Sequence, residues 1–324
     1  MPEAKHAQWK LLAAFAAVYI VWGSTYLAIR YAIETIPPFL MAGSRFLLSG
    51  SVLLIWSIWR GAERPKWIHW RTALIMGAFM LLVGNGAVTW AEQRIVSGVA
   101  ALLIASEPLW LVLLAWAWPG GIAPSKVDLA AIGLGFGGVA LLFAPAWSVG
   151  NAGGFHLFSA ALILVSAISW AAGSLYGTTA PMSRFSGLAN AMTMLCGGAL
   201  LFITGVMTGE ISRFRPDTIS VASLAAFFYL AIFGSLIGFT SYMYLLAHTT
   251  PAKASTYAFV NPVVAVLLGW ALAGEPLTRS SVLAMCTIVA AVVLITMGQS
   301  RKRKQVRVND PLEGRKPVAQ CAGD

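Results

Sequence analysis

Charged residues are scarce in this sequence, since Asp, Glu, Lys and Arg together make up 10% of its 324 residues. A soluble domain normally carries about 25% charged residues, so this composition excludes an ordinary soluble fold. It also excludes intrinsic disorder, which requires low hydrophobicity and high charge. Cysteine is scarce as well: the chain has three cysteines and no Cys-x-x-Cys pair. Neither a disulfide scaffold nor a structural metal site is therefore predicted.

Apolar residues are abundant instead, at 58% of the chain, and the mean hydropathy is +0.76. They form continuous stretches of about 20 residues, the length that crosses a bilayer as a helix, whereas barrel strands would alternate over about 10 residues. The first stretch, 11–29, is uncharged and longer than the apolar core of a signal peptide, so it is expected to be a spanning helix. The sequence predicts an all-α polytopic membrane protein.

Ten spanning helices are expected along the chain. No charged residue occurs between Asp128 and Arg184, and that stretch is too long for one helix. Turn-forming residues at 145–154 divide it into spans five and six. The ten predicted spans are 11–30, 38–59, 72–91, 96–118, 128–145, 156–179, 185–207, 219–246, 253–273 and 280–299.

The distribution of basic residues predicts the orientation. With the N-terminus in the cytoplasm, 16 of the 22 Lys and Arg residues lie on the cytoplasmic side, five lie outside, and Arg45 lies within span two. Because basic residues collect in cytoplasmic loops, both termini are expected inside. The basic run 301–304 follows the last span directly, so it is interpreted as a topology anchor near anionic lipid rather than a nucleic-acid site.

An internal repeat relates the two halves of the chain at an offset of 154 residues. The segment 97–108, which ends in Glu107-Pro108, aligns with 251–262, which ends in Asn261-Pro262. Each half has five predicted spans, and an odd number inverts the second half relative to the first, a recurring plan of secondary transporters. The expected units are an N-terminal segment 1–10, the repeats 11–150 and 151–299, and a basic tail 300–324.

These features resemble the EamA type of the drug/metabolite transporter superfamily over about residues 11–298. The resemblance is carried by Trp22-Gly-Ser-Thr-Tyr26, by Pro38 through Arg45-Phe46, by the two Pro-containing pairs above, and by Gly274-Glu275-Pro276 before span ten. The first half has Trp118-Pro-Gly-Gly121 where the second has that acidic turn. The resemblance implies a bacterial inner-membrane carrier of metabolites, amino acids or drugs, often an exporter, and no particular substrate.

Two charged residues fall in the interior of predicted spans, away from the span ends. Glu107 lies near the middle of span four, where a lone charge costs at least about 2.5–3.5 kcal/mol, so it is expected to face a cavity, to be paired or to be protonated. It is a candidate proton carrier or binder of cationic groups, or else a structural partner of Arg45. Arg45 could instead extend outward to the membrane surface or hold a substrate carboxylate.

Matched prolines and polar residues mark the same depth. Pro108 and Pro262 lack an N–H and are expected to kink spans four and nine, which would allow both to flex as hinges. Asn261 is expected to bind a neighbour or the substrate. Asn85, between two glycines in span three, also requires a polar partner.

Aromatic residues are expected to wall a central cavity. Trp22 and Tyr26 share one helix face, and Thr25 lies between them. Trp90, Tyr176 and Tyr257 are predicted around the same cavity, although packing is the commoner role of any one ring. Aromatic walls suit bulky or cationic organic ligands through stacking and cation–π contact.

The function predicted from these residues is secondary transport of a small-molecule substrate. No nucleotide-binding or catalytic motif has the necessary context, so neither a cofactor nor an enzyme activity is predicted; the alternatives are an intramembrane enzyme and a non-transporting sensor or structural protein. Gly133-x-x-x-Gly137 in span five and the small residues of span ten are expected either to pack together or to form a homodimer face.

Overall fold

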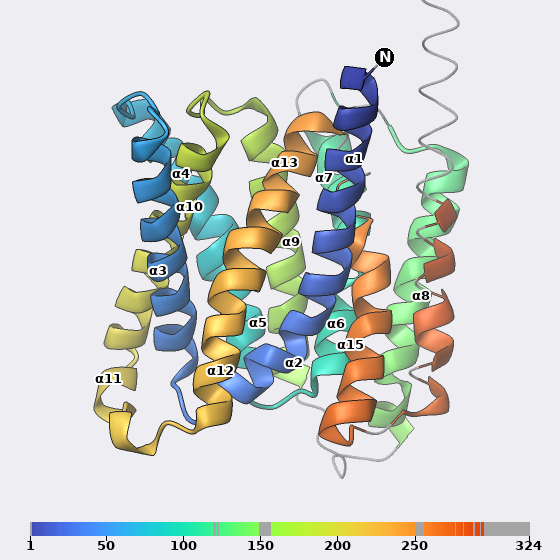
Figure 1. The fold of residues 1–324 in the computed structure, drawn as a ribbon. Coiled ribbons are helices and arrows are strands. Elements are labelled where there is room, and N and C mark those ends of the chain that lie inside the picture. The colour runs from blue at the N-terminus through green and yellow to red at the C-terminus, as the bar shows by residue number, and fades with distance from the viewer. Residues whose placement is uncertain are drawn as a thin grey trace, which may run out of the picture.

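The computed structural model contains helices joined by turns and loops, and no strand, in the part of the chain that it describes (Figure 1). It describes residues 2–118, 121, 123–148, 157–249, 254, 256–275, 277–280, 282–287, 289–291 and 293–294. Residues 149–154 of the predicted turn 145–154, and the basic tail 300–324, lie outside these residues. An all-α fold was expected from the long apolar stretches, because each helix satisfies its own backbone within the bilayer.

Seven helical segments are long and apolar enough to cross a membrane: Gln8–Ala32, Pro38–Trp59, Trp67–Ala91, Ser97–Ala117, Leu157–Thr179, Ser186–Met207 and Val221–His248. Each corresponds to one predicted span, with ends displaced by five residues at most. Shorter apolar helices cover Val260–Ala273 and Val282–Ala291, in the regions of predicted spans nine and ten. The multi-span prediction is therefore confirmed, and the count of ten stays a prediction.

Several of these segments are built from more than one helical element. The first contains α1 (Pro2–Ala17), the π-helical η1 (Val18–Trp22) and α2 (Gly23–Ala32). The second and third contain α3 (Pro38–Trp59), then α4 (Trp67–Met76), η2 (Gly77–Asn85) and α5 (Gly86–Ala91). The fourth contains α6 (Ser97–Ile104) and α7 (Glu107–Ala117).

The rest of the described chain is also built from helical elements. It contains α8 (Lys126–Ser148), α9 (Leu157–Thr179), α10 (Ser186–Met207), α11 (Glu210–Arg213), the 3-10 turn η3 (Pro216–Thr218), α12 (Val221–Tyr229), η4 (Leu230–Phe239), α13 (Thr240–His248) and α15 (Tyr257–Ala273). Helix α8 continues three residues beyond the predicted end at Pro145, because a proline removes its own hydrogen bond without obliging the helix to stop.

Close packing between α3 and α10 depends on glycine. A Cβ on Gly43 of α3 would lie 2.6 Å from the backbone nitrogen of Phe202 in α10. A Cβ on Gly198 of α10 would lie 2.9 Å from the backbone nitrogen of Leu47 in α3. The two backbones therefore approach more closely than any larger residue allows, as small residues permit in membrane helices.

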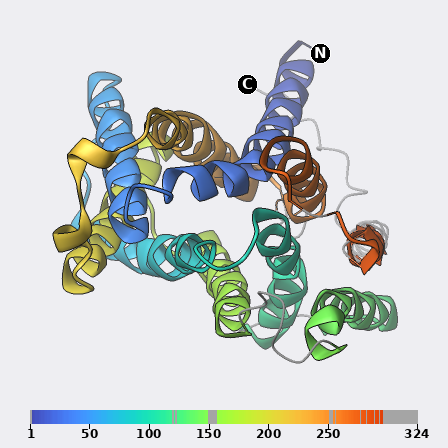
Figure 2. The same ribbon diagram turned by 90° about the horizontal axis from the view of Figure 1, so that it is seen from below.

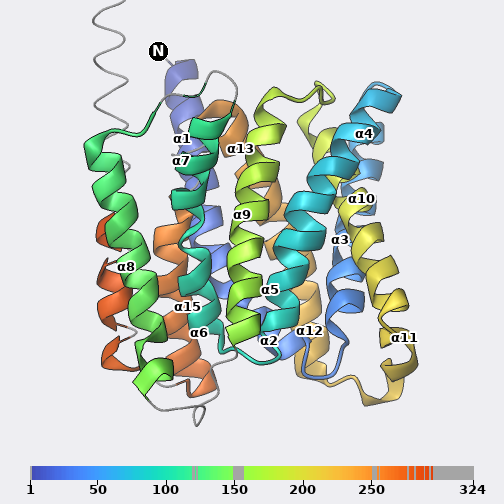
Figure 3. The same ribbon diagram turned by 180° about the vertical axis from the view of Figure 1, so that it is seen from behind.

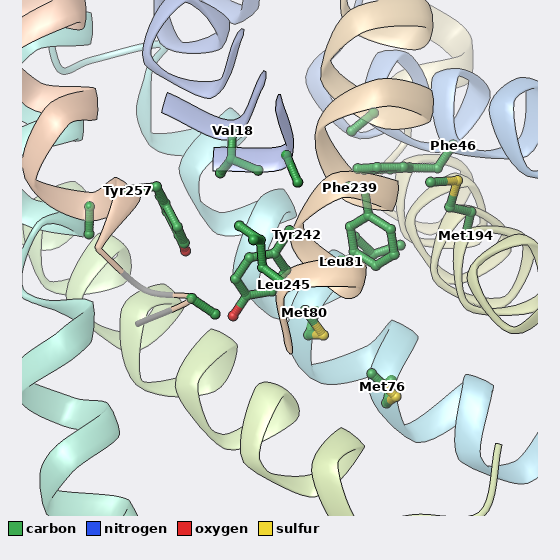
Figure 4. Packing of buried hydrophobic residues seen from close by; sticks show 14 of the residues in the cluster. Val18, Phe46, Met76, Met80, Leu81, Met194, Phe239, Tyr242, Leu245 and Tyr257 are labelled. Carbon is green, nitrogen blue, oxygen red and sulfur yellow. The ribbon is translucent and has the colours of Figure 1, made fainter. Parts of the chain in front are cut away.

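The largest buried apolar cluster joins segments that are far apart in the sequence (Figure 4). Val18 of η1, Met80 of η2, Phe239 of η4, Tyr242 of α13 and Tyr257 of α15 all belong to it. It lies between the helices of both halves, so the two halves share one core.

The π-helical segments η2 and η4 occupy matching positions in the two halves. Adding the repeat offset of 154 to η2, 77–85, gives 231–239, and η4 covers Leu230–Phe239. Their displaced carbonyls accept hydrogen bonds from neighbouring helices. Ser166 Oγ donates to the Gly84 carbonyl at 2.5 Å, and Trp22 Nε1 donates to the Gly234 carbonyl at 3.0 Å. Such bulges are common at functional sites.

The matched prolines have different local structures. Span four is broken at residues 105–106, between α6 and α7, so that Pro108 is the second residue of α7 (Figure 3). Ser106 stabilises the break: its hydroxyl donates to the Leu103 carbonyl at 2.7 Å. In contrast, Pro262 lies inside the continuous helix α15.

Helix α8 stands at the periphery of the bundle in the view along the helix axes (Figure 2). A Cβ on Gly135 would contact Leu109 of α7 and, at 3.4 Å, the Ala291 Cβ of predicted span ten. Cβ atoms on Gly133 and Gly137 would have no neighbour within 4 Å among the described residues. Predicted spans five and ten thus touch through Gly135, and the homodimer face stays a prediction.

Candidate functional site

A central cavity lies among the helices of both halves, with about 690 Å³ of space free of protein atoms, including the part open to its mouth. It brings together eight of the ten residues that the sequence singles out as a binding site: Trp22, Thr25, Tyr26, Arg45, Asn85, Glu107, Tyr257 and Asn261. The other lining residues are Ile29, Phe46, Gly84, Val88, Ile104, Ser166, Ala167, Trp170, Gly234 and Phe239.

Four aromatic rings close one side of this cavity. Trp22 is central: its ring centroid lies 4.9 Å from Tyr257, 5.1 Å from Tyr242 and 5.5 Å from Trp170. Tyr242 is fully buried behind the lining, and its hydroxyl shares a 2.7 Å hydrogen bond with Ser174. The contacts of Trp22 with Tyr257 and Trp170 are edge-to-face, an arrangement that stabilises aromatic clusters, and the contact with Tyr242 is tilted. Tyr242 and Tyr257 belong to the buried apolar cluster of Figure 4, and Trp22 and Trp170 pack against it.

Glu107 is the acidic group of the cavity lining. It is 1% exposed, and neither carboxyl oxygen has a hydrogen-bond partner within the described residues. It begins α7 immediately after the break in span four, so the break sets the side chain at mid-depth. A buried carboxyl without a partner is costly as an anion and is available to a proton or to a cationic ligand.

Arg45 lines the same cavity and does not extend to the surface, since it is 3% exposed. Its Nη2 donates to Asn85 Oδ1 at 2.5 Å, which supplies the partner that Asn85 requires. Arg45 Nε has no partner in the described part of the chain. Within those residues the one ion pair joins Arg30 and Glu275, so Arg45 and Glu107 face one cavity without a salt bridge between them.

Asn261 links the cavity to the first helix of the chain. With its amide oriented so that the nitrogen faces two carbonyls, it donates to Tyr257 O and Tyr19 O, each at 3.1 Å. Tyr19 and Thr256 add a 2.8 Å hydroxyl hydrogen bond nearby. Asn261 therefore has protein partners, one of the two roles that the sequence left open.

Trp90 and Tyr176 do not line the cavity. Trp90 packs edge-to-face on Phe158, at 5.8 Å between ring centroids, and Arg94 lies 4.7 Å from its ring. Tyr176 packs against the buried apolar cluster instead. Sequence position alone could not show that these two side chains do not reach the cavity.

The structure also adds residues that sequence reasoning missed. Trp170 and Ser166 of α9 are four residues apart, so one helix face delivers both to the cavity. That spacing inside an apolar span was the available signal. Glu275 is the larger omission, because the sequence showed it only as part of a loop motif.

Glu275 joins three helices at the end of the bundle where α6 begins, at the bottom of Figure 1. Its carboxylate forms an ion pair with Arg30 of α2 and accepts from Ser97 N at 3.1 Å, Ser97 Oγ at 2.8 Å and Gly98 N at 3.2 Å. Gly274, with φ +63°, ends α15 and turns the chain so that Glu275 reaches α6. We call these four residues, Arg30, Ser97, Gly98 and Glu275, the clamp.

Both halves of the chain match a known protein family. The model of the EamA-like transporter family matches residues 8–144 and again 157–297. A solved structure, titled only as the crystal structure of a protein, has the same fold, with a TM-score of 0.65 at 19% identity over 94% of this chain and 99% of that one.

Curated relatives cover nearly the whole chain. The uncharacterized inner membrane transporter YedA of Escherichia coli is 42% identical over 89% of this chain and 91% of its own length. Protein PecM of Dickeya dadantii is 28% identical, over 90% and 94%. A probable terminal-alkyne amino-acid exporter of Streptantibioticus cattleyicolor is 26% identical, over 90% and 96%. The chain therefore belongs to the EamA-like transporter family, within the drug/metabolite transporter superfamily.

Proposed function

We propose that this protein is a multi-pass inner-membrane secondary transporter that exports a small organic molecule by alternating access. Membership of the EamA-like transporter family supports the transport activity, and the name of YedA supports both this activity and a location in the inner membrane. The central cavity supports a substrate site between the halves of the chain.

The repeated plan supports alternating access. The family model matches the chain twice, and η2 and η4 fall at the same offset of 154 residues that relates 97–108 to 251–262. Ten spans in two inverted halves would let one cavity open to either side as the halves rock. The break before Pro108 provides one hinge, and Pro262, although its helix is continuous, is the proposed second.

The substrate class follows from one observation: the cavity holds an acid and a base that do not neutralise each other. Glu107 has two unpaired oxygens, and Arg45 has an unpaired Nε. A substrate carrying both an amine and a carboxylate would satisfy both groups. The rings of Trp22 and Tyr257 would contact the amine or an apolar side chain. The amino-acid exporter among the relatives agrees with this class.

Transport in proteoliposomes tests the proposal. Amino acids, cationic drugs and anionic metabolites are offered as separate labelled pools, with and without an imposed pH gradient. We expect wild-type protein to move amino acids faster when the gradient is present. Glu107→Gln should lose the response to the gradient and slow transport about tenfold, equivalent to about 1.4 kcal/mol, because a neutral amide neither carries a proton nor attracts an amine.

Glu63→Gln is the matched control, since Glu63 is exposed in the loop between α3 and α4. It should behave as wild type. Equal gradient responses in wild type and Glu107→Gln would show that Glu107 is structural. Transport of cations alone would contradict the role given to Arg45, and the absence of movement in every pool would contradict the transport proposal itself.

A further inference from the structure

Glu92 is a buried carboxyl to which the transport site assigns no role. It follows α5 directly, one residue beyond the candidate span Trp67–Ala91, and its backbone nitrogen donates to the Val88 carbonyl at 3.0 Å. The residue is 5% exposed, and neither carboxyl oxygen has a hydrogen-bond partner among the described residues. A carboxyl in this state is either a buried, unpaired anion or a protonated acid, and the anion is by far the more costly.

The charged groups around Glu92 come from three other elements. Glu275 approaches from the loop after α15, Arg30 from α2 and Arg45 from α3, all close enough to interact electrostatically, and Tyr26 of α2 is a further titratable neighbour. Burial raises the pKa of the Glu92 carboxyl well above its usual range, and the Glu275 carboxylate raises it further; the two arginines act in the opposite direction. Burial and the Glu275 carboxylate thus both favour the neutral form of Glu92.

Arg30 thus interacts with two acids. It pairs with Glu275, which also accepts three hydrogen bonds from Ser97 and Gly98, whereas Glu92 lies within electrostatic range of Arg30 and has no hydrogen-bond partner among the described residues. The Arg30 side chain is 35% exposed, so it can move without passing through the apolar core. The clamp joins α2, α6 and α15, and each of these helices or its continuation lines the cavity.

We propose that Glu92 is a second proton-binding residue of the transport cycle, which receives Arg30 from Glu275 when it loses its proton and so opens the clamp. The inference rests on the proposed transport function. In the closed state Glu92 holds its proton and Arg30 is bound to Glu275. On opening, the O–H bond of Glu92 breaks, the proton passes to water at the clamp end of the bundle, and the new carboxylate pairs with Arg30.

The sign of the pH dependence follows from the raised pKa. Glu92 is protonated, and the clamp closed, at pH values below that pKa. As the pH rises through it, an unpaired buried carboxylate forms beside Arg30 and pulls the guanidinium from Glu275. The cavity should therefore open at the clamp end as the pH rises, with or without substrate.

Accessibility of one introduced cysteine measures this opening without any knowledge of the substrate. In a background with Cys196, Cys286 and Cys321 replaced by Ser, Val88→Cys places a thiol in the cavity lining, one helical turn before Glu92. Its labelling by a membrane-impermeant maleimide is followed from about pH 6 to about pH 9, a range that includes the values known for buried carboxyls. Each rate is divided by that of Val221→Cys, an 85% exposed site, to remove the pH dependence of the thiol itself.

We expect the ratio to rise about tenfold with pH when Glu92 is present, to stay low at every pH in Glu92→Gln, and to rise again in Glu92→Asp. Glutamine has the shape of the neutral acid, so the variant should fold. If it does not fold, infrared difference spectra between about pH 6 and about pH 9 provide a second readout. The spectra must show the loss of a protonated carboxyl band at the higher pH, and this loss must persist in Glu107→Gln, where Glu107 cannot cause it.

A ratio that rises equally in wild type and Glu92→Gln would overturn the proposal, and so would a ratio that never changes in wild type. Neither result concerns substrate movement. Failure of transport in proteoliposomes, with the pH-dependent ratio intact, would instead contradict the transport function and leave the protonation switch in place.

Discussion

Gly43→Ala should lower the thermal stability of the protein by about 5 °C or more. The new Cβ would lie 2.6 Å from the Phe202 nitrogen and 2.8 Å from its Cα, both backbone atoms of α10 that cannot rotate aside. Overpacking a core in this way costs typically about 1–3 kcal/mol, here in the contact that joins α3 to α10. Thermal unfolding of the purified protein in detergent, followed by loss of the monodisperse species, measures the shift.

Gly133→Ala is the matched control, because it makes the same change in another apolar helix. A Cβ there would have no neighbour within 4 Å in the described structure. Alanine also favours helix over glycine by about 1 kcal/mol. Stability should be unchanged or slightly higher. A loss of stability at Gly133 would indicate that a second copy covers this face of α8, and equal stability of Gly43→Ala and wild type would refute the close contact.

The spans could be predicted because their signal is local. Stretches of about 20 apolar residues specify membrane helices wherever their neighbours lie, and seven predicted spans return as helices of sufficient length. Helix ends were less accurate, as at α8, where Pro145 does not end the helix. The offset of 154 residues was also visible in the sequence, and the π-helical segments at that offset were not, because bulges depend on partners such as Ser166.

Residues of the candidate site could be predicted where depth in the membrane alone requires a side chain to face a cavity or a partner. A charge at mid-span must face a cavity or a partner, and Glu107 and Arg45 both line the cavity. Trp90 and Tyr176 were chosen by depth too, and they do not line the cavity, because depth alone does not determine which side chains reach it. The break before Pro108 depends on Ser106, whose hydroxyl is used only once the chain has turned.

The clamp was not predictable, because Arg30 and Glu275 are 245 positions apart and each resembles an ordinary loop charge. Glu275 appeared only as part of a turn motif, and Glu92 was not among the residues singled out from the sequence. Their importance comes from burial, at 7% and 5% exposure, which only the packed bundle creates. A charged residue at the end of a span can therefore be as important as one at its centre.

Glu275→Ala should have the largest effect on stability of any substitution outside the apolar core. It would leave the backbone N–H groups of Ser97 and Gly98 buried without an acceptor, at about 1–3 kcal/mol each. Loss of the Arg30 ion pair should add less, because Arg30 is 35% exposed and can reach water. We expect a loss of about 2–4 kcal/mol in unfolding measurements, together with labelling of Val88→Cys at every pH.

Glu210→Ala isolates the contribution of the clamp from that of helix capping. Glu210 accepts hydrogen bonds from the backbone nitrogens of Phe39, at 3.2 Å, and Leu40, at 2.9 Å, and so caps α3 as Glu275 caps α6, without an ion pair among the described residues. Its removal should cost about 1–2 kcal/mol and leave Val88→Cys protected at low pH. Equal labelling in both alanine variants would mean that a helix cap, rather than the bond to Arg30, keeps the cavity closed. Labelling at low pH that increases in Glu275→Ala alone would assign closure to the clamp.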